Sequence, residues 1–121
     1  SIEAWRDERL VGGLYGVSLR SAFFGESMFV RPELGGTDAS KVCFVALVAH
    51  LRNRGYTLLD AQMMSQHLAR LGGIPVDDRA YQVLLNAALE RTDVSWGTFE
   101  SESLLAPWRQ IGNRPEGVVG P

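Results

Sequence analysis

Cysteine is nearly absent from this 121-residue chain. The single thiol, Cys43, excludes a disulfide within the chain. A lone cysteine favours a reduced, intracellular setting, and its place in an apolar helical stretch predicts that Cys43 is a core residue. The longest apolar run, residues 42–49, is too short to span a bilayer, and no signal peptide is visible. We therefore expect no membrane partner.

An excess of positive charge is also missing. Twelve Lys and Arg against 14 Asp and Glu give a net charge of −2, which argues against a protein that holds nucleic acid by bulk charge alone. Metal-ligand spacing is absent, because His50 and His67 lie far apart and Cys43 is near neither. We expect no metal and no cofactor, and we expect His50 to be either partly exposed on its helix or an edge residue whose hydrogen bonds are satisfied.

Two common catalytic signatures are missing as well. Gly12, Gly13 and Gly16 lie in strand-like sequence with no helix directly after them, so they do not form a phosphate-binding loop. Glycines inside a strand instead suggest a bulge or the close approach of another group. Ser27 has no base beside it in sequence, which leaves a nucleophilic triad without support.

The sequence does contain a regular succession of short elements. Patterning predicts three strands, a glycine-containing loop, a helix, a short buried strand and two further helices, at residues 2–6, 9–19, 21–30, 32–36, 39–54, 56–61, 65–71 and 77–90. Thr37 or Asp38 is expected to cap the first helix and Gly55 to end it. This order predicts an α+β fold with helices packed on a mostly antiparallel sheet.

The domain organisation follows from the same pattern. Residues 1–91 are expected to form one domain, and residues 92–121 an irregular C-terminal tail, because glycine and proline leave the tail little regular structure. Five apolar residues are candidates for docking the tail onto the domain: Trp96, Phe99, Leu104, Leu105 and Trp108. The last helix is expected to bury one apolar face, made of Tyr81, Leu84, Leu85, Ala88 and Leu89.

Glu26 is the most distinctive residue of the chain. It lies directly after Gly25 within an aromatic and aliphatic strand. Burying a carboxylate among apolar groups is costly unless something pairs with it. We therefore expect Glu26 to be buried and to have a partner, either another residue or the amine or hydroxyl of a bound substrate.

Asp60 and Gln62 form a second candidate site at the end of the short strand. Residues two apart on a strand point the same way, so a carboxylate there can fix the direction of the amide. The oriented amide oxygen can then accept a hydrogen from an incoming amine; the alternative is a plain strand-end cap. The loop and helix between the two strands can bring Glu26 and Asp60 into one cleft, lined by Tyr15 and Met28, that suits a substrate amine.

Four motifs, in this order, resemble the leucyl/phenylalanyl-tRNA–protein transferase family over about residues 2 to 91. They are Gly-Gly-Leu-Tyr-Gly-Val at 12–17, Phe-Gly-Glu-Ser-Met-Phe at 24–29, Asp-Ala-Ser-Lys at 38–41 and Leu-Asp-Ala-Gln at 59–62, followed by His-Leu-Ala-Arg-Leu-Gly at 67–72. The resemblance implies a catalytic domain of N-acetyltransferase-like fold. It also implies an N-terminal segment upstream of Ser1, absent here, that helps to hold the tRNA end.

The resemblance implies a cytoplasmic enzyme that transfers Leu or Phe from aminoacyl-tRNA to the N-terminal Arg or Lys of a protein, which marks that protein for degradation. Gln62 would receive the proton of the attacking amine, Asp60 would orient it, and Glu26 would contact the aminoacyl-adenosine end. Four residues would form the pocket for the transferred side chain: Leu14, Met28, Leu47 and Leu59.

Two other hypotheses stay open at this point. One is an acetyl-CoA-dependent N-acetyltransferase of similar fold, which needs a pyrophosphate-binding turn at a helix N-terminus that we do not find. The other is a non-catalytic fragment of the transferase, in which Glu26 and the Asp60 pair are structural. The family pattern also has Gly and Ser where this chain has Arg20 and Val30, and its Ile-Pro-Arg element is Ile-Pro-Val at 74–76.

Overall fold

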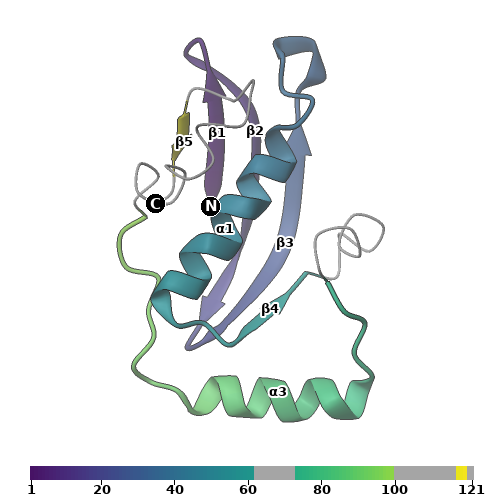
Figure 1. The fold of residues 1–121 in the computed structure, drawn as a ribbon, viewed down its shortest axis with the longest axis vertical. Coiled ribbons are helices and arrows are strands. Elements are labelled where there is room, and N and C mark those ends of the chain that lie inside the picture. Colours follow the sequence, from purple (N-terminus) through teal and green to yellow (C-terminus); the bar gives the residue numbers. More distant parts are fainter. Residues whose placement is uncertain (62–72, 100–116, 120–121) are drawn as a thin grey trace.

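The computed structural model describes residues 1–61, 73–99 and 117–119. In these residues five strands form one sheet and two α-helices lie beside it (Figure 1). The elements are β1 (Ile2–Arg6), β2 (Arg9–Leu19), β3 (Ala22–Val30), the 3₁₀ turn η1 (Pro32–Leu34), α1 (Ala39–Arg54), β4 (Leu58–Asp60), α3 (Asp78–Glu90) and β5 (Gly117–Val119). The predicted α+β class is confirmed; the expected helix at 65–71 lies outside the described residues.

The strand order is β4-β3-β2-β1-β5. β1 and β2, β2 and β3, and β1 and β5 pair antiparallel, whereas β3 and β4 pair parallel. A parallel pair needs a crossover connection, and here η1 and α1 supply it, with α1 lying across one face of the sheet (Figure 1). The expected mostly antiparallel sheet is therefore confirmed.

The core lies between α1 and the sheet. Cys43 is fully buried, as expected, beside other apolar residues of α1 and the first three strands, among them Phe44, Leu47, Val11, Leu14 and Phe23. Burial raises the pKa of the Cys43 thiol to about 12. Among the described residues, neither helix is long and apolar enough to cross a membrane.

The ends of α1 match the sequence signals in part. Asp38 is the N-cap residue, but its side chain makes no capping hydrogen bond. Its carboxylate instead accepts a hydrogen bond from Lys41 Nζ at 3.1 Å. Gly55 ends the helix as predicted, with a φ of 83° that favours glycine because side chains rarely adopt it.

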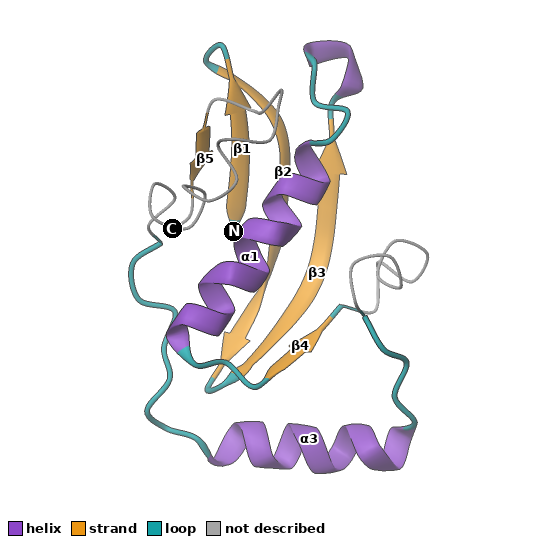
Figure 2. Ribbon diagram, in the orientation of Figure 1, coloured by secondary structure: helices purple, strands orange, loops and turns teal. Residues whose placement is uncertain are grey.

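The last helix departs from the sequence expectation. It begins where predicted, because Asp77 Oδ1 accepts a hydrogen bond from the Ala80 amide at 2.8 Å. Of the five residues expected to be buried, however, Ala88 is the one in the core, and Leu84 is 43% exposed. The reason is position, since α3 lies beyond one end of the sheet rather than across its face (Figure 2).

The tail contributes more structure than expected. Gly117–Val119 forms β5 on the edge of β1, so the tail is not wholly irregular. Trp96 and Phe99 pack against the core as expected, with ring centroids 4.4 and 5.2 Å from that of His50; the other three docking candidates lie outside the described residues. His50 is consequently 1% exposed, so partial exposure is wrong, whereas the alternative of a hydrogen-bonded histidine agrees with its contact to the Trp96 carbonyl.

Candidate active site

Glu26 is the extra residue of a β-bulge. In the β2–β3 ladder Tyr15 faces Ser27 and Gly16 faces Gly25, which leaves Glu26 without a partner on β2. Bulges redirect side chains and are frequent next to functional sites. Glu26 is exposed, so its expected burial is wrong. It lies past the end of β4, whose last residue pairs with Phe24, and among the described residues no strand covers that side.

The glycine opposite this bulge is explained by close approach. A Cβ atom at Gly16 would lie 2.1 Å from the carbonyl oxygen of Phe24 and 2.6 Å from a ring carbon of Phe23. Only glycine fits such a backbone contact without displacement. The prediction that a strand glycine marks a bulge or a close approach is confirmed at this position.

A small apolar pocket lies between the sheet and α1. The pocket is open to solvent on one side. Its walls come from β2, β3, α1, β4 and the residue after β4, and consist of Leu14, Tyr15, Gly25, Ser27, Met28, Phe44, Leu47, Leu59 and Ala61. The structure thus brings together all four residues expected to form an apolar pocket.

The sequence explains this convergence. Leu14 and Met28 are direct partners in the β2–β3 ladder, so their side chains share one face of the sheet. Leu47 and Phe44 are one helical turn apart on α1 and turn toward that face. Phe44 was not singled out from the sequence, although its three-residue spacing from Leu47 is the signal that identifies it.

The parallel pairing of β3 and β4 places the two acidic candidates near each other. Asp60 pairs with Phe24, two residues before Glu26, and Asp60 precedes the pocket residue Ala61. Gln62 lies outside the described residues, so its position beside Asp60 stays a prediction. Within the described part of the chain, no group of three His, Cys, Asp or Glu residues is placed to hold a metal ion.

Asp60 has a partner that the sequence did not indicate. Its Oδ2 atom accepts a hydrogen bond from the hydroxyl of Tyr81 on α3 at 2.7 Å. This bond, more than the burial of the phenol or the charge of Asp60, raises the pKa of Tyr81 above its usual value. From the sequence, Tyr81 was assigned to the apolar face of its helix. Local sequence pattern could not predict a hydrogen bond to a carboxylate 21 residues away.

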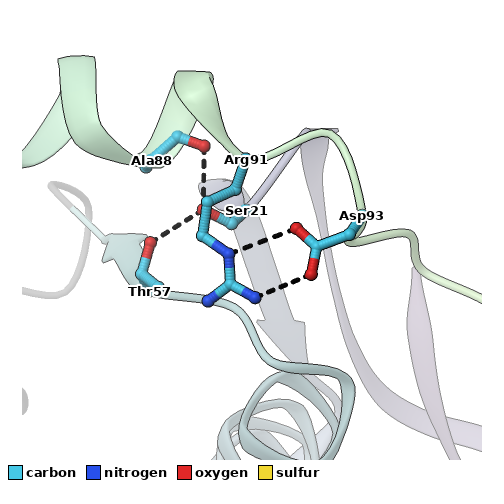
Figure 3. Close-up of polar contacts among 5 residues, drawn as sticks. All are labelled: Ser21, Thr57, Ala88, Arg91 and Asp93. Atoms are coloured by element: carbon cyan, nitrogen blue, oxygen red, sulfur yellow. Dashed lines mark hydrogen bonds and ion pairs between the residues drawn. The ribbon is translucent and has the colours of Figure 1, made fainter.

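Ser21 attaches the other end of α3 (Figure 3). The fully buried Ser21 hydroxyl donates to the carbonyl of Ala88 at 2.8 Å and lies 2.7 Å from the Thr57 hydroxyl. Because a hydroxyl has one hydrogen to donate, Thr57 is the donor to Ser21. Just beyond the helix, the exposed Arg91 and Asp93 form an ion pair at 2.9 Å.

Comparison with known proteins identifies the family of this chain. Residues 1–86 match the family model described as leucyl/phenylalanyl-tRNA protein transferase. The chain belongs to that family, which confirms the resemblance drawn from the four motifs.

Two relatives bear the name leucyl/phenylalanyl-tRNA–protein transferase. The protein from Chlorobium limicola is 50% identical over 91 residues, which cover 75% of this chain and 45% of the relative. The protein from Phenylobacterium zucineum is 57% identical over 89 residues, which cover 74% of this chain and 38% of the relative. The chain therefore spans less than half the length of each relative.

Proposed function

We propose that the protein containing this chain is an aminoacyl-tRNA–protein transferase. It transfers Leu or Phe from aminoacyl-tRNA to the N-terminal Arg or Lys of a protein in the cytoplasm, and so marks that protein for degradation. We also propose that its helix-covered sheet, with a parallel step from β3 to β4, is of the N-acetyltransferase type. The observation that carries the function is the convergence of Leu14, Met28, Leu47 and Leu59 on one pocket near Asp60 and Glu26.

The pocket suits the side chain of a transferred Leu or Phe. Most of the side chains that line it are apolar, which is the environment that an aliphatic or aromatic side chain requires. Burying a leucyl or phenylalanyl side chain there stabilises the complex by about 1.5–3 kcal/mol relative to leaving it exposed. Glu26, on the bulge beside the pocket residues Gly25 and Ser27, binds the amine and ribose of the aminoacyl-adenosine end.

The chemistry needs no further activation, because an aminoacyl ester is already reactive. The peptide amine attacks the ester carbonyl, a C–N bond forms, and the C–O bond to the tRNA ribose breaks. Positioning the two reactants supplies much of the acceleration. Gln62 accepts a hydrogen bond from the amine as an orienting group, since a neutral amide is a poor base, and Asp60 takes the proton. Asp60 then returns this proton to the ribose oxygen, which leaves as a hydroxyl.

The test uses leucyl-tRNA, a peptide with N-terminal Arg, and the protein as encoded, with any sequence that flanks residues 1–121. We expect Gln62→Ala to lower the rate of transfer about a hundredfold or more. Glu26→Gln should weaken the use of aminoacyl-tRNA, whereas Glu33→Gln, an exposed carboxylate on η1, should not. Equal transfer by wild type and Gln62→Ala would contradict the assigned mechanism, and equal use of aminoacyl-tRNA by Glu26→Gln would remove its role.

The segment before α1 does not support the alternative of an acetyl-CoA-dependent N-acetyltransferase. A Cβ atom at Gly36 would lie 2.2 Å from the carbonyl oxygen of Val11, so this glycine serves protein packing rather than a ligand. Binding of acetyl-CoA would favour that alternative. Absence of transfer by the wild-type protein would favour the non-catalytic one.

A further inference from the structure

Helix α3 is held to the sheet at two hydrogen-bonded points. At its C-terminal end the Ser21 hydroxyl donates to Ala88, and nearer its start the Tyr81 hydroxyl donates to Asp60. Most of the remaining helix surface is exposed, including Val83 at 64%. These two points have different consequences, because only Tyr81 touches a residue of the candidate site.

Asp60 is the last residue of β4, a strand of three residues. A side chain at a strand end lacks neighbours on both sides that would fix its direction, so a hydrogen bond from another element decides where the carboxylate points. Tyr81 provides that bond from a helix whose first turn is fixed by the Asp77 cap. Among the described residues, Tyr81 is the hydrogen-bond donor to the Asp60 side chain.

The chemistry of the donor suits this task. A phenol is neutral, so it orients a carboxylate without cancelling its charge, as a Lys or Arg partner would. An ionised carboxylate has about four acceptor sites on its two oxygens. Tyr81 occupies one site on Oδ2, which leaves Oδ1 and the remaining site of Oδ2 for a reacting group.

We propose that Tyr81 is a positioning residue, whose hydroxyl fixes the direction of the Asp60 carboxylate so that its free oxygen can accept the proton of the attacking amine. This inference rests on the proposed function. It adds α3 to the elements that build the site, although α3 lies beyond the end of the sheet (Figure 2).

The first test is Tyr81→Phe, which removes the hydroxyl and keeps the ring. We expect kcat for transfer to fall about tenfold to a hundredfold, because a misdirected catalytic group costs this much, while KM for aminoacyl-tRNA and for peptide stays unchanged. Ser21→Ala is the matched control, since it weakens the other attachment of α3 without touching Asp60. A similar fall in kcat for both variants would show that helix docking, and not Asp60 orientation, is responsible.

The second test is a double-mutant cycle with Asp60→Ala. If Tyr81 acts through Asp60, Tyr81→Phe lowers the residual rate no further in the Asp60→Ala protein. Fully additive losses would overturn the proposal, and so would full activity of Tyr81→Phe in a protein whose wild type transfers leucine. If the wild type transfers nothing, the proposed function fails instead.

A titration independent of activity tests the contact itself. Followed by ultraviolet absorbance, the tyrosine transition that disappears in Tyr81→Phe should move toward lower pH in Asp60→Ala, because the pKa of Tyr81 is raised by its bond to Asp60. An unchanged transition would show that the hydrogen bond does not form, and would overturn the positioning role whatever the activity.

Discussion

At the residue scale, the candidate site depends on positions where the backbone geometry allows only one type of residue. Gly16 faces the bulge that carries Glu26, and the space a side chain would need there is filled by backbone of β3. The sequence indicated a bulge or close approach through its strand glycines. It did not indicate that Glu26 itself is the extra residue, because pairing register depends on the partner strand and not on local composition.

Gly16→Ala should therefore destabilise the fold. The new Cβ would overlap the carbonyl oxygen of Phe24, which cannot move without disturbing the β2–β3 ladder, and such overpacking costs about 1–3 kcal/mol. Urea unfolding measures the change. Gly25→Ala is the control, since its Cβ would meet its nearest atom at 3.5 Å, an ordinary contact. Equal midpoints for Gly16→Ala and Gly25→Ala would contradict the close approach.

At the element scale, the bounds of the strands and helices were predictable from the sequence, but the position of each element relative to the sheet was less predictable. The bounds of β1, β2 and α1 follow directly from alternation, helical periodicity and the glycine at 55. The pairing of β3 with β4 was foreseen from the helical crossover between them, and it brings Asp60 toward Glu26. The exposure of α3 was not foreseen. Apolar periodicity predicts that a helix has an apolar face, but it does not predict whether the sheet packs against that face.

The N-cap of α3 offers a test at this scale. Asp77→Ala removes the hydrogen bond to the Ala80 amide and should cost about 1 kcal/mol of helix stability. Hydrogen exchange in the first turn of α3, around Tyr81, should become several times faster. Asp78→Ala is the control, as Asp78 is acidic and lies in the same turn but does not cap it. Equal exchange in the two variants would argue against the cap.

At the scale of the whole molecule, the segment around Trp96 packs against the core at His50. The Nε2 atom of His50 lies 2.8 Å from the Trp96 carbonyl oxygen; because a carbonyl can only accept, this nitrogen carries the hydrogen. Burial lowers the pKa of the His50 imidazole and nearby Arg54 adds to this, while the hydrogen bond to Trp96 opposes it. The folded protein thus disfavours the charged form of His50, chiefly because the ring is buried.

A pH dependence of stability follows. Above about pH 6.5 His50 is neutral in both states and stability is full. As the pH falls below that value, the unfolded chain takes up a proton that the folded protein does not, so the free energy of unfolding decreases by at most about 1.4 kcal/mol per pH unit until the lowered pKa is reached. Urea midpoints at pH 7.5 and 5.5 should differ in the wild type and in His67→Gln, but less in His50→Gln. A wild-type midpoint that does not fall would contradict the lowered pKa.

The bulge on β3 has a consequence for how this protein can vary. A bulged residue stands outside the ladder, so the pairs on either side of it, Tyr15 with Ser27 and Gly16 with Gly25, do not depend on which side chain it carries. Substitution at Glu26 therefore leaves Met28 against Leu14 in the pocket wall. The proposed affinity of Glu26 for the polar end of a substrate and the stability of the sheet are therefore separable, and natural or engineered change at this position can act on the first while the second is preserved.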